Sequence, residues 1–206
     1  MYNKEFFEKV VNVDCSFKEL KSFCANIDKE KYDTDNAFEK YYNVESILKA
    51  INRYKNGEVS DIYLAYWANA YGWIIMAGFK SVKNSAGITF REWLEWEISD
   101  FLDSLSFFDA SYSWYDADDY EKGFKRIDAI YKNSDDWNCF FSPAAVTHGY
   151  DDVDMLLVNR KTKKFIKTCS ESDCVDGKGD MKKLKSDEMK KEIAKLKAAG
   201  YRKSKW

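Results

Sequence analysis

A run of aromatic residues limits the folds open to this chain more than any other feature of its sequence. The stretch YKNGEVSDIYLAYWANAYGWIIMAG, residues 54–78, places apolar side chains on nearly every face of the helix that its spacing predicts. Ser60 is a suitable N-cap for that helix. A helix that is apolar nearly all round is stable when neighbours cover several of its faces. The stretch therefore predicts the central helix of a bundle.

Amphipathic patterns on both sides of this stretch predict the surrounding helices. Residues 16–27 and 36–56 carry apolar side chains at spacings of three and four, and Gly57 is placed to end the second of these helices. Thr89 and Glu92 have the spacing of a capping box at the start of a helix that reaches residue 108. A further helix is expected over 120–131. About residues 3–132 are thus expected to form a helical bundle.

The spacing of apolar residues changes after this bundle. The sequence DWNCFFSPAAV alternates, and VDMLLVNRKTKKFIKT contains two β-rich runs around a polar turn at 159–162, which predicts a hairpin. Ser186 and Gly200 delimit a last, lysine-rich helix over 186–199. We expect an α+β fold in a single domain, 1–206. It consists of a helical part (1–134), a small antiparallel β element (about 137–168, within 135–170) and the basic C-terminal helix.

The charges are unevenly distributed along the chain. From residue 181 to 206, ten Lys and Arg face three acidic residues, so this tail is about +7 and the remainder about −9 within a net charge of −2. The lysines fall on all the non-core faces of one amphipathic helix and Arg is scarce, which argues against nucleic acid as the partner. Docking of this helix on its own chain or on a partner stays open.

The composition limits the cellular compartment in which we expect this protein and the kinds of metal or cofactor site that it can contain. The longest apolar run, 73–79, is far too short to span a membrane, and the N-terminus lacks the pattern of a signal peptide. Five cysteines, an odd number, indicate free thiols in a reducing compartment, so we expect a cytoplasmic protein. A single His rules out a two-His metal site within this chain, and no cofactor is expected.

Two sets of residues leave an enzymatic function as an alternative. Asp151, Asp152 and Asp154 precede a predicted strand, where carboxylates can bind a divalent cation, although acids are also common in such turns. Cys139 and His148 could form a nucleophile pair if the fold brings them together.

Three other residues have weaker signals. Cys169 and Cys174 lie close in sequence but lack two further zinc ligands nearby. Glu97 lies between two tryptophans of a predicted helix, where a carboxylate serves more often as a hydrogen-bond acceptor in a core than as a catalytic acid.

Rings and carboxylates alternate in SFFDASYSWYDADDYEKGF, residues 106–124, at the junction after a long helix. Aromatic anchors with a charged rim suit a protein interface, and acidic clusters steer association with a basic partner. The residues predicted to bind this partner are Asp109, Tyr112, Trp114, Tyr115, Asp116, Asp118, Asp119 and Glu121.

The stretch INRYKNGEVSDIYLAYWANAYGWII, residues 51–75, resembles a sequence pattern found in small bacterial immunity proteins of polymorphic-toxin and contact-dependent-inhibition systems. The resemblance covers these 25 residues and consists of core and cap positions, not of a catalytic motif. It implies a cytosolic, non-enzymatic protein that binds one cognate toxin domain and blocks it.

Two alternatives to an immunity protein remain. A phage or mobile-element inhibitor of a host defence nuclease, of the anti-CRISPR kind, would present the same acidic surface. The other is the metal-dependent enzyme that uses Asp151, Asp152 and Asp154.

Overall fold

A computed structural model describes residues 4–27, 37–77, 89–108, 115–143, 152–171 and 180–205. The chain divides into two compact units. Residues 1–79 and 97–128 form a helical unit, and residues 80–96 and 129–206 form a sheet unit. Helices and a five-stranded sheet follow one another along the chain, so the α+β class predicted from the sequence is confirmed.

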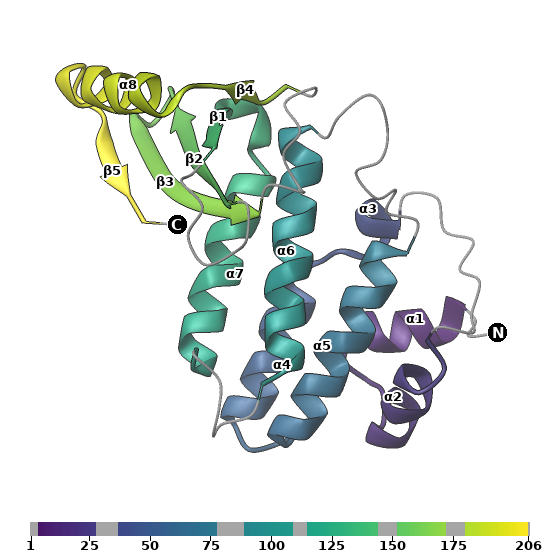
Figure 1. Cartoon of the computed structure of the whole chain (residues 1–206). Helices are drawn as coiled ribbons and strands as arrows, with labels where there is room; N and C mark the ends of the chain where they lie inside the picture. Colours follow the sequence, from purple (N-terminus) through teal and green to yellow (C-terminus); the bar gives the residue numbers. More distant parts are fainter. Residues whose placement is uncertain are drawn as a thin grey trace. The chain divides into compact units, whose positions relative to one another are not determined.

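The helices of the first part of the chain are shown in Figure 1. They are α1 (Lys4–Val11), α2 (Phe17–Cys24), α3 (Ala37–Tyr41), α4 (Val44–Lys55), α5 (Asp61–Met76), α6 (Phe90–Ser106) and α7 (Ala117–Tyr131). The predicted caps are present. Ser60 accepts a hydrogen bond from the Tyr63 N–H (3.2 Å), and Thr89 and Glu92 form a capping box. Gly57, with φ of 71°, ends α4 as expected.

Helix α5 is the central helix of its unit, as its composition predicts. It contacts α1, α2, α3 and α4, and Trp67 and Tyr71 on it are fully buried and stacked, with ring centroids 4.9 Å apart. The Trp67 indole N–H donates to the Val10 carbonyl (2.9 Å), so the polar atom of the largest buried side chain has a partner. Burial on this scale explains why the aromatic density lies here.

The prediction of one continuous helix over 36–56 is wrong, because the chain leaves helical geometry at residues 42–43. The buried Tyr71 hydroxyl accepts from the Asn43 N–H (2.7 Å) and donates to the Tyr41 carbonyl (3.0 Å), so it replaces the helical bonds that the break removes. Asn43, at φ −150°, then caps α4 by accepting from the Glu45 N–H (3.0 Å). The interruption depends on a tyrosine 28 residues away, which helical periodicity does not reveal.

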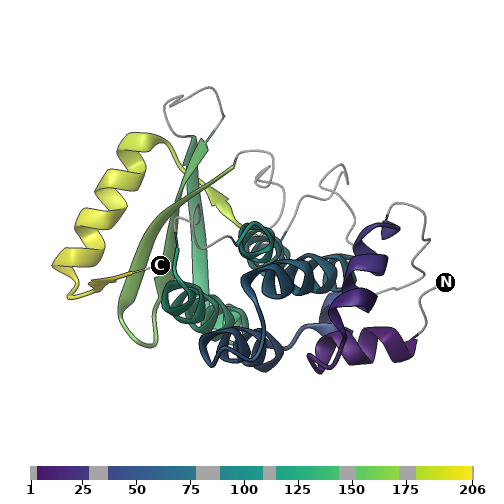
Figure 2. The same cartoon turned by 90° about the horizontal axis from the view of Figure 1, so that it is seen from below.

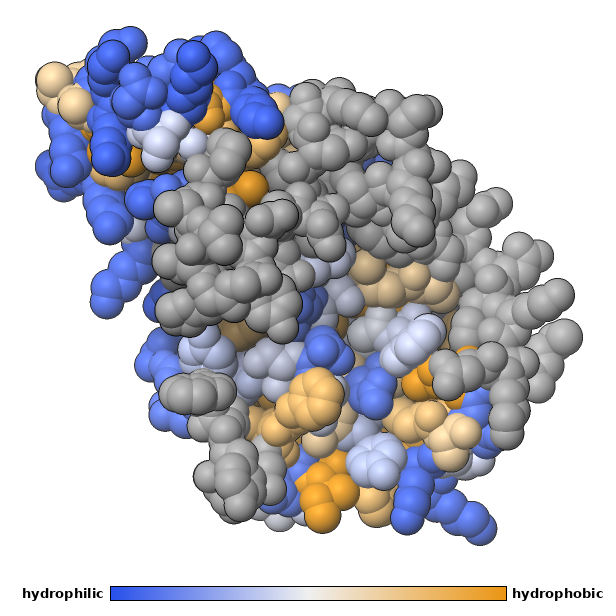
Figure 3. Space-filling view, in the orientation of Figure 1, coloured by the Kyte–Doolittle hydropathy of each residue, from blue (hydrophilic) through white to orange (hydrophobic). Residues whose placement is uncertain are grey.

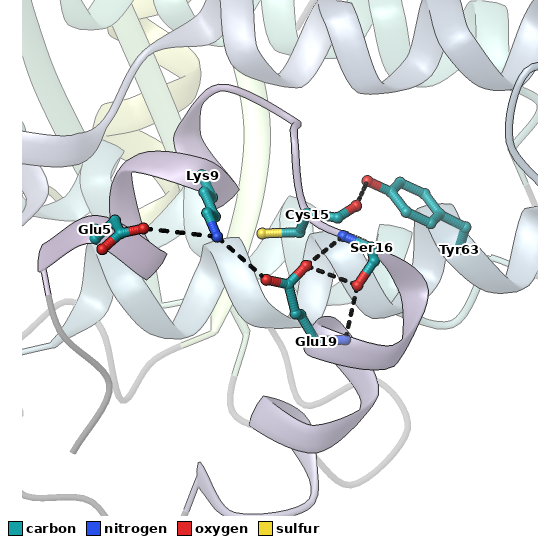
Figure 4. A network of polar contacts seen from close by, with 6 residues as sticks. All are labelled: Glu5, Lys9, Cys15, Ser16, Glu19 and Tyr63. Carbon is teal, nitrogen blue, oxygen red and sulfur yellow. Dashed lines mark hydrogen bonds and ion pairs between the residues drawn. The ribbon is translucent and has the colours of Figure 1, made fainter.

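The turn between α1 and α2 is held by side chains of α4 and α5. Val13 adopts a left-handed conformation (φ 57°), which is costly for a β-branched residue. Arg53 donates to the Val13 carbonyl (2.6 Å) and Lys49 to the Asn12 carbonyl (2.6 Å). Tyr63 donates to the carbonyl of Cys15 (2.8 Å; Figure 4). Donors from two helices thus stabilise a backbone conformation that is unfavourable on its own.

Figure 4 also shows how α2 begins. Glu19 accepts from the backbone N–H of Ser16 (2.8 Å) and from its hydroxyl (2.7 Å), while Ser16 Oγ accepts from the Glu19 N–H (3.3 Å), which completes a capping box. Lys9 of α1 pairs with the same carboxylate (3.4 Å) and with Glu5 (3.8 Å). These bonds fix the direction in which α2 leaves the turn.

The sheet has the strand order β4-β1-β2-β3-β5. Its strands are β1 (Trp137–Pro143), β2 (Asp152–Asn159), β3 (Lys164–Glu171), β4 (Lys182–Lys183) and β5 (Arg202–Ser204), and a 3₁₀ turn, η2 (Ser134–Asp136), precedes β1. The predicted hairpin is present as the antiparallel pair β2–β3. The sheet is mixed, not only antiparallel as predicted, because β4 pairs with β1 and β5 pairs with β3 in parallel.

Helix α8 (Ser186–Ala198) covers one face of this sheet (Figure 2), as the buried cluster between them requires. Gly200, with φ of 82°, follows the helix and lets the chain turn into β5, so the predicted C-terminal helix and its stop are confirmed. The α8 face of the sheet unit has its own core, made of Leu156, Val158, Phe165, Met189 and Leu196.

Replacement of Trp67 tests the central position of α5. Trp67→Ala should lower the free energy of unfolding by about 3–5 kcal/mol, because a fully buried indole leaves a cavity. Trp73→Ala on the same helix should cost about 1 kcal/mol or less, since that side chain is 46% exposed. Urea denaturation of both variants measures the difference. Equal losses would show that α5 is not buried as described.

Candidate functional site

One end of the helical unit brings together most of the described residues that the sequence nominates. We call it the acidic-aromatic end. It consists of the C-terminal ends of α4 and α6 and the N-terminal ends of α5 and α7, residues 54–62, 101–108 and 115–124. Tyr54 of α4 packs edge-on against Phe108 after α6 (5.0 Å between ring centroids), and Lys55 of α4 pairs with Asp118 and Glu121 of α7.

A cluster of rings forms the base of this end. Phe101 lies within 6 Å of the ring centroids of Tyr115 (5.9 Å), Tyr120 (5.0 Å) and Phe124 (4.7 Å). Gly123 permits this packing, because a Cβ at that position would lie 2.4 Å from the Phe101 ring. The Tyr120 hydroxyl is hydrogen-bonded to Ser104 Oγ at 2.9 Å. Interlocked rings, of which Tyr120 and Phe124 are fully buried, give this end a rigid foundation.

Three apolar side chains at this end face solvent. Phe107 is 74% exposed, Ile62 is 56% exposed and Tyr115 is 47% exposed. In Figure 3 orange and tan side chains gather over the part of the helical unit where α5 begins and α6 ends. Isolated exposed apolar residues are common, but several around one helix end make a candidate protein-binding patch. Phe107 is the most exposed of the large hydrophobic residues described.

The carboxylates of this end differ in their roles. Asp116 caps α7 by accepting from the Asp119 N–H (2.8 Å). Asp118 and Glu121 share the Lys55 ammonium group, at 2.5 Å and 2.9 Å. Asp119 is exposed in the first turn of α7, and no ion pair to it is found among the described residues. It is therefore the carboxylate best placed for an external cation.

The ion pairs shift the titration of their members. Hydrogen bonds from Lys125 and then Lys55 lower the pKa of Glu121 to about 2, and Lys55 lowers the pKa of Asp118. Hydrogen bonds to Asp118 and then to Glu121 raise the pKa of Lys55 to about 12. The carboxylates thus stay charged over a wide pH range. The whole unit is acidic, with 13 Lys and Arg against 21 Asp and Glu, a net charge of −8.

The structure describes five of the eight residues that the sequence predicts to bind a partner. Tyr115, Asp116, Asp118, Asp119 and Glu121 lie together at the acidic-aromatic end. The remaining three, Asp109, Tyr112 and Trp114, lie outside the described residues. Whether this set binds a partner stays a prediction.

Sequence reasoning missed Ile62 and Phe107. Two adjacent phenylalanines, Phe107 and Phe108, follow α6, and Phe108 is buried while Phe107 points outward. Ile62 lies on the helix that the sequence predicts to be covered on most sides. In both cases the sequence has more apolar residues than one buried face can cover. This excess was the signal that could have revealed them.

The residues proposed for metal binding do not form a site among the described positions. Asp154 pairs with Lys167 across the sheet (3.0 Å). Asp151 lies outside the described residues, and of Asp152 the backbone position in β2 is described. No group of three potential His, Cys, Asp or Glu ligands occurs in the part of the chain that the structure describes.

The buried thiols are poorly suited to nucleophilic chemistry. Burial raises the pKa of the Cys139 thiol well above its ordinary value, and that of Cys15 to about 12, so both stay protonated at neutral pH. His148, the predicted partner of Cys139, lies outside the described residues, as does Cys174. Cys169 is exposed, and Glu97 is half-buried on α6.

Comparisons with known proteins give no relative: no family model, curated protein or solved structure matches this chain. A search of the described helices finds none that combines the length and the apolar character needed to cross a bilayer.

The lowered pKa values predict how acid acts on this end. A carboxylate whose pKa is lowered in the folded protein stabilises it above its unfolded pKa, and this contribution is lost as pH falls through the folded value. For Glu121 that window extends from about pH 4.5 to about 2. Lys55→Met should therefore reduce the loss of Tm over this range at low salt. The effect should be modest, because these groups are exposed.

A matched variant controls for the loss of one positive charge. Lys191→Met removes an exposed lysine of α8 that pairs with Asp187 in the i,i+4 geometry. Its acid-induced change in Tm should follow that of the wild type. If the two variants behave alike, the Lys55 pairs are not formed in solution.

Proposed function

We propose that this protein is a non-enzymatic inhibitor that binds one partner protein through the acidic-aromatic end, and that the partner is a bacterial toxin domain with a basic surface. The observation that carries the proposal is the exposure of Phe107, Ile62 and Tyr115 at the end of the helical unit where α7 begins with Asp118 and Asp119. Exposed apolar side chains on a rigid base, next to carboxylates of which Asp119 has no ion pair among the described residues, are the chemistry of a tight protein interface.

The two kinds of residue have separate roles. Exposed rings lose little conformational entropy when they are covered, and such anchors dominate the affinity of most interfaces. Carboxylates around them accelerate encounter with a basic partner, and they do so less as salt increases. Asp118 and Glu121 are already held by Lys55, so Asp119 is the member of this group with most to gain from a new cation.

The family resemblance supports a toxin as the partner. Residues 51–75, which resemble immunity proteins of polymorphic-toxin systems, include the end of α4 and the start of α5 at the acidic-aromatic end. A toxin that acts on nucleic acid has a basic active-site surface, which the net charge of −8 of the helical unit would complement.

Co-expression with the product of the adjacent gene tests this function. That product should arrest growth when it is induced alone, and this protein should restore growth and form a one-to-one complex in native mass spectrometry. A phage setting, with a host nuclease as the protein blocked, would identify the protein as a mobile-element inhibitor. Growth arrest without rescue, and absence of a complex, would contradict the proposal.

Surface variants test which residues make the complex. Phe107→Ala should weaken binding by about 2 kcal/mol or more, as expected for a central ring anchor. Asp119→Lys should slow association several-fold at low salt, and this effect should shrink as salt is added. Surface plasmon resonance with the captured toxin measures both rates.

Asp187→Lys is the matched control for Asp119→Lys. Asp187 is an exposed carboxylate in the first turn of α8, so its reversal has the same effect on net charge and a similar effect on the helix dipole. It lies in the sheet unit and should leave the association rate nearly unchanged. Equal slowing by both variants would mean that only the net charge matters and would exclude this end as the interface.

A further inference from the structure

A groove between α8 and β1 lies within the sheet unit and has a different chemistry. Its larger part, about 710 Å³, and its smaller part, about 270 Å³, share the lining residues Asn138, Phe140, Arg160, Glu192 and Lys195, so they form one continuous depression. We call it the α8–β1 groove. All of its lining residues are described by the structure.

Half-buried rings form the floor of this groove. Phe140 of β1 and Tyr201 after α8 both line its smaller part and both pack against the core beneath α8. Gly200 sets the position of Tyr201, because its left-handed conformation (φ 82°) lets the Tyr201 N–H donate to the Leu196 carbonyl (2.9 Å). The rings are thus held in place, with part of each accessible from the groove.

Cations form the rim. Arg160, Lys182, Lys191 and Lys195 line the groove, and no ion pair of Arg160 or Lys182 is found among the described residues. Three carboxylates also line the groove, and because hydrogen bonds from backbone N–H groups do not remove their charge, the lining has a net charge of +1. Asp180 accepts from the Phe90 N–H (2.6 Å), Glu188 accepts from the Lys185 N–H (2.8 Å), and Glu192 faces Lys195.

The surface of the sheet unit distinguishes between two classes of occupant. The large exposed hydrophobic residues of the described chain all belong to the helical unit, and the space-filling view is blue over α8 (Figure 3). Lysine is depleted in the cores of protein interfaces, whereas interfaces with nucleic acid are polar and positively charged. These observations favour a polyphosphate over a protein.

We infer that the α8–β1 groove binds single-stranded nucleic acid, with phosphates on its cationic rim and bases against Phe140 and Tyr201. A groove that combines positive charge with accessible rings is how single strands are bound without sequence preference. A duplex would contact the outer lysines but would not reach the rings. The inference is independent of the proposed inhibition. It differs from the expectation from sequence, which considered the lysines of the C-terminal helix alone, because Phe140 of β1 and Arg160 of the hairpin turn complete the groove beside α8.

Fluorescence anisotropy with labelled oligothymidine of about 20 nucleotides tests this inference. The full-length protein should bind it at low salt, with an affinity that falls steeply as salt increases. The triple variant Arg160→Glu, Lys182→Glu, Lys195→Glu should bind at least about tenfold more weakly and show a shallower salt dependence. Tyr201→Leu, which keeps an apolar side chain over the core, should weaken binding about tenfold through loss of stacking.

Controls separate the groove from charge in general. The variant Lys18→Glu, Lys21→Glu, Lys40→Glu changes the net charge equally at exposed positions of the helical unit and should keep the wild-type affinity. Equal loss in that variant, tighter binding of the matching duplex, or an unchanged affinity in Tyr201→Leu would each overturn the inference. Equal binding of poly-glutamate would do the same and would identify an acidic protein as the occupant.

Discussion

Side-chain donors from α4 and α5 to backbone carbonyls organise the helical unit. Trp67 binds the last turn of α1, while Arg53 and Tyr63 bind the turn that follows it. The Val13 and Cys15 carbonyls lie in the turn after α1, outside the hydrogen bonds of a helix, so the side-chain bonds satisfy groups that burial would otherwise leave unpaired. The Val10 carbonyl already accepts from the Val13 N–H (3.0 Å) and gains the Trp67 indole as a second donor. The left-handed Val13 is tolerable for the same reason, since its carbonyl is held at 2.6 Å by Arg53. Polar atoms on buried aromatic side chains therefore help to fix where the short N-terminal helices lie, in addition to the apolar contacts of Phe7, Val10 and Phe23.

This arrangement also accounts for the surface. Once Trp67 and Tyr71 face inward, Ile62 and Trp73 must point outward, because they lie on the opposite side of the same helix. The order imposed by the buried donors therefore leaves apolar side chains in water. Ile62 at the start of α5 thus adds to the exposed apolar side chains, with Phe107 and Tyr115, of the acidic-aromatic end. Core and candidate interface thus have one origin in the composition of α5.

Short-range sequence signals correctly predicted the features that depend on residues close to one another in the chain. The Thr89–Glu92 capping box and the glycines after α4 and α8 act within a few residues, and the structure has them where they were expected. Non-local bonds decided the rest. The break before α4 depends on Tyr71, and β5 exists only because α8 returns the chain to the edge of β3. Of the candidate site, sequence patterns found the carboxylates but not which of them Lys55 neutralises, since that lysine comes from another helix.

Charge separation between the units suits the two proposed binding surfaces to partners of opposite charge. The helical unit has a net charge of −8 and the sheet unit, with 20 basic and 14 acidic residues, has +6. The near-neutral whole therefore conceals two fields of opposite sign, each of which extends about a Debye length from its own surface. The acidic unit bears the exposed rings that a protein interface needs, whereas the described surface of the basic unit is polar. Under the two proposals, one surface is suited to a cationic protein and the other to a polyphosphate, so ligands of opposite charge would be drawn to different parts of the same molecule.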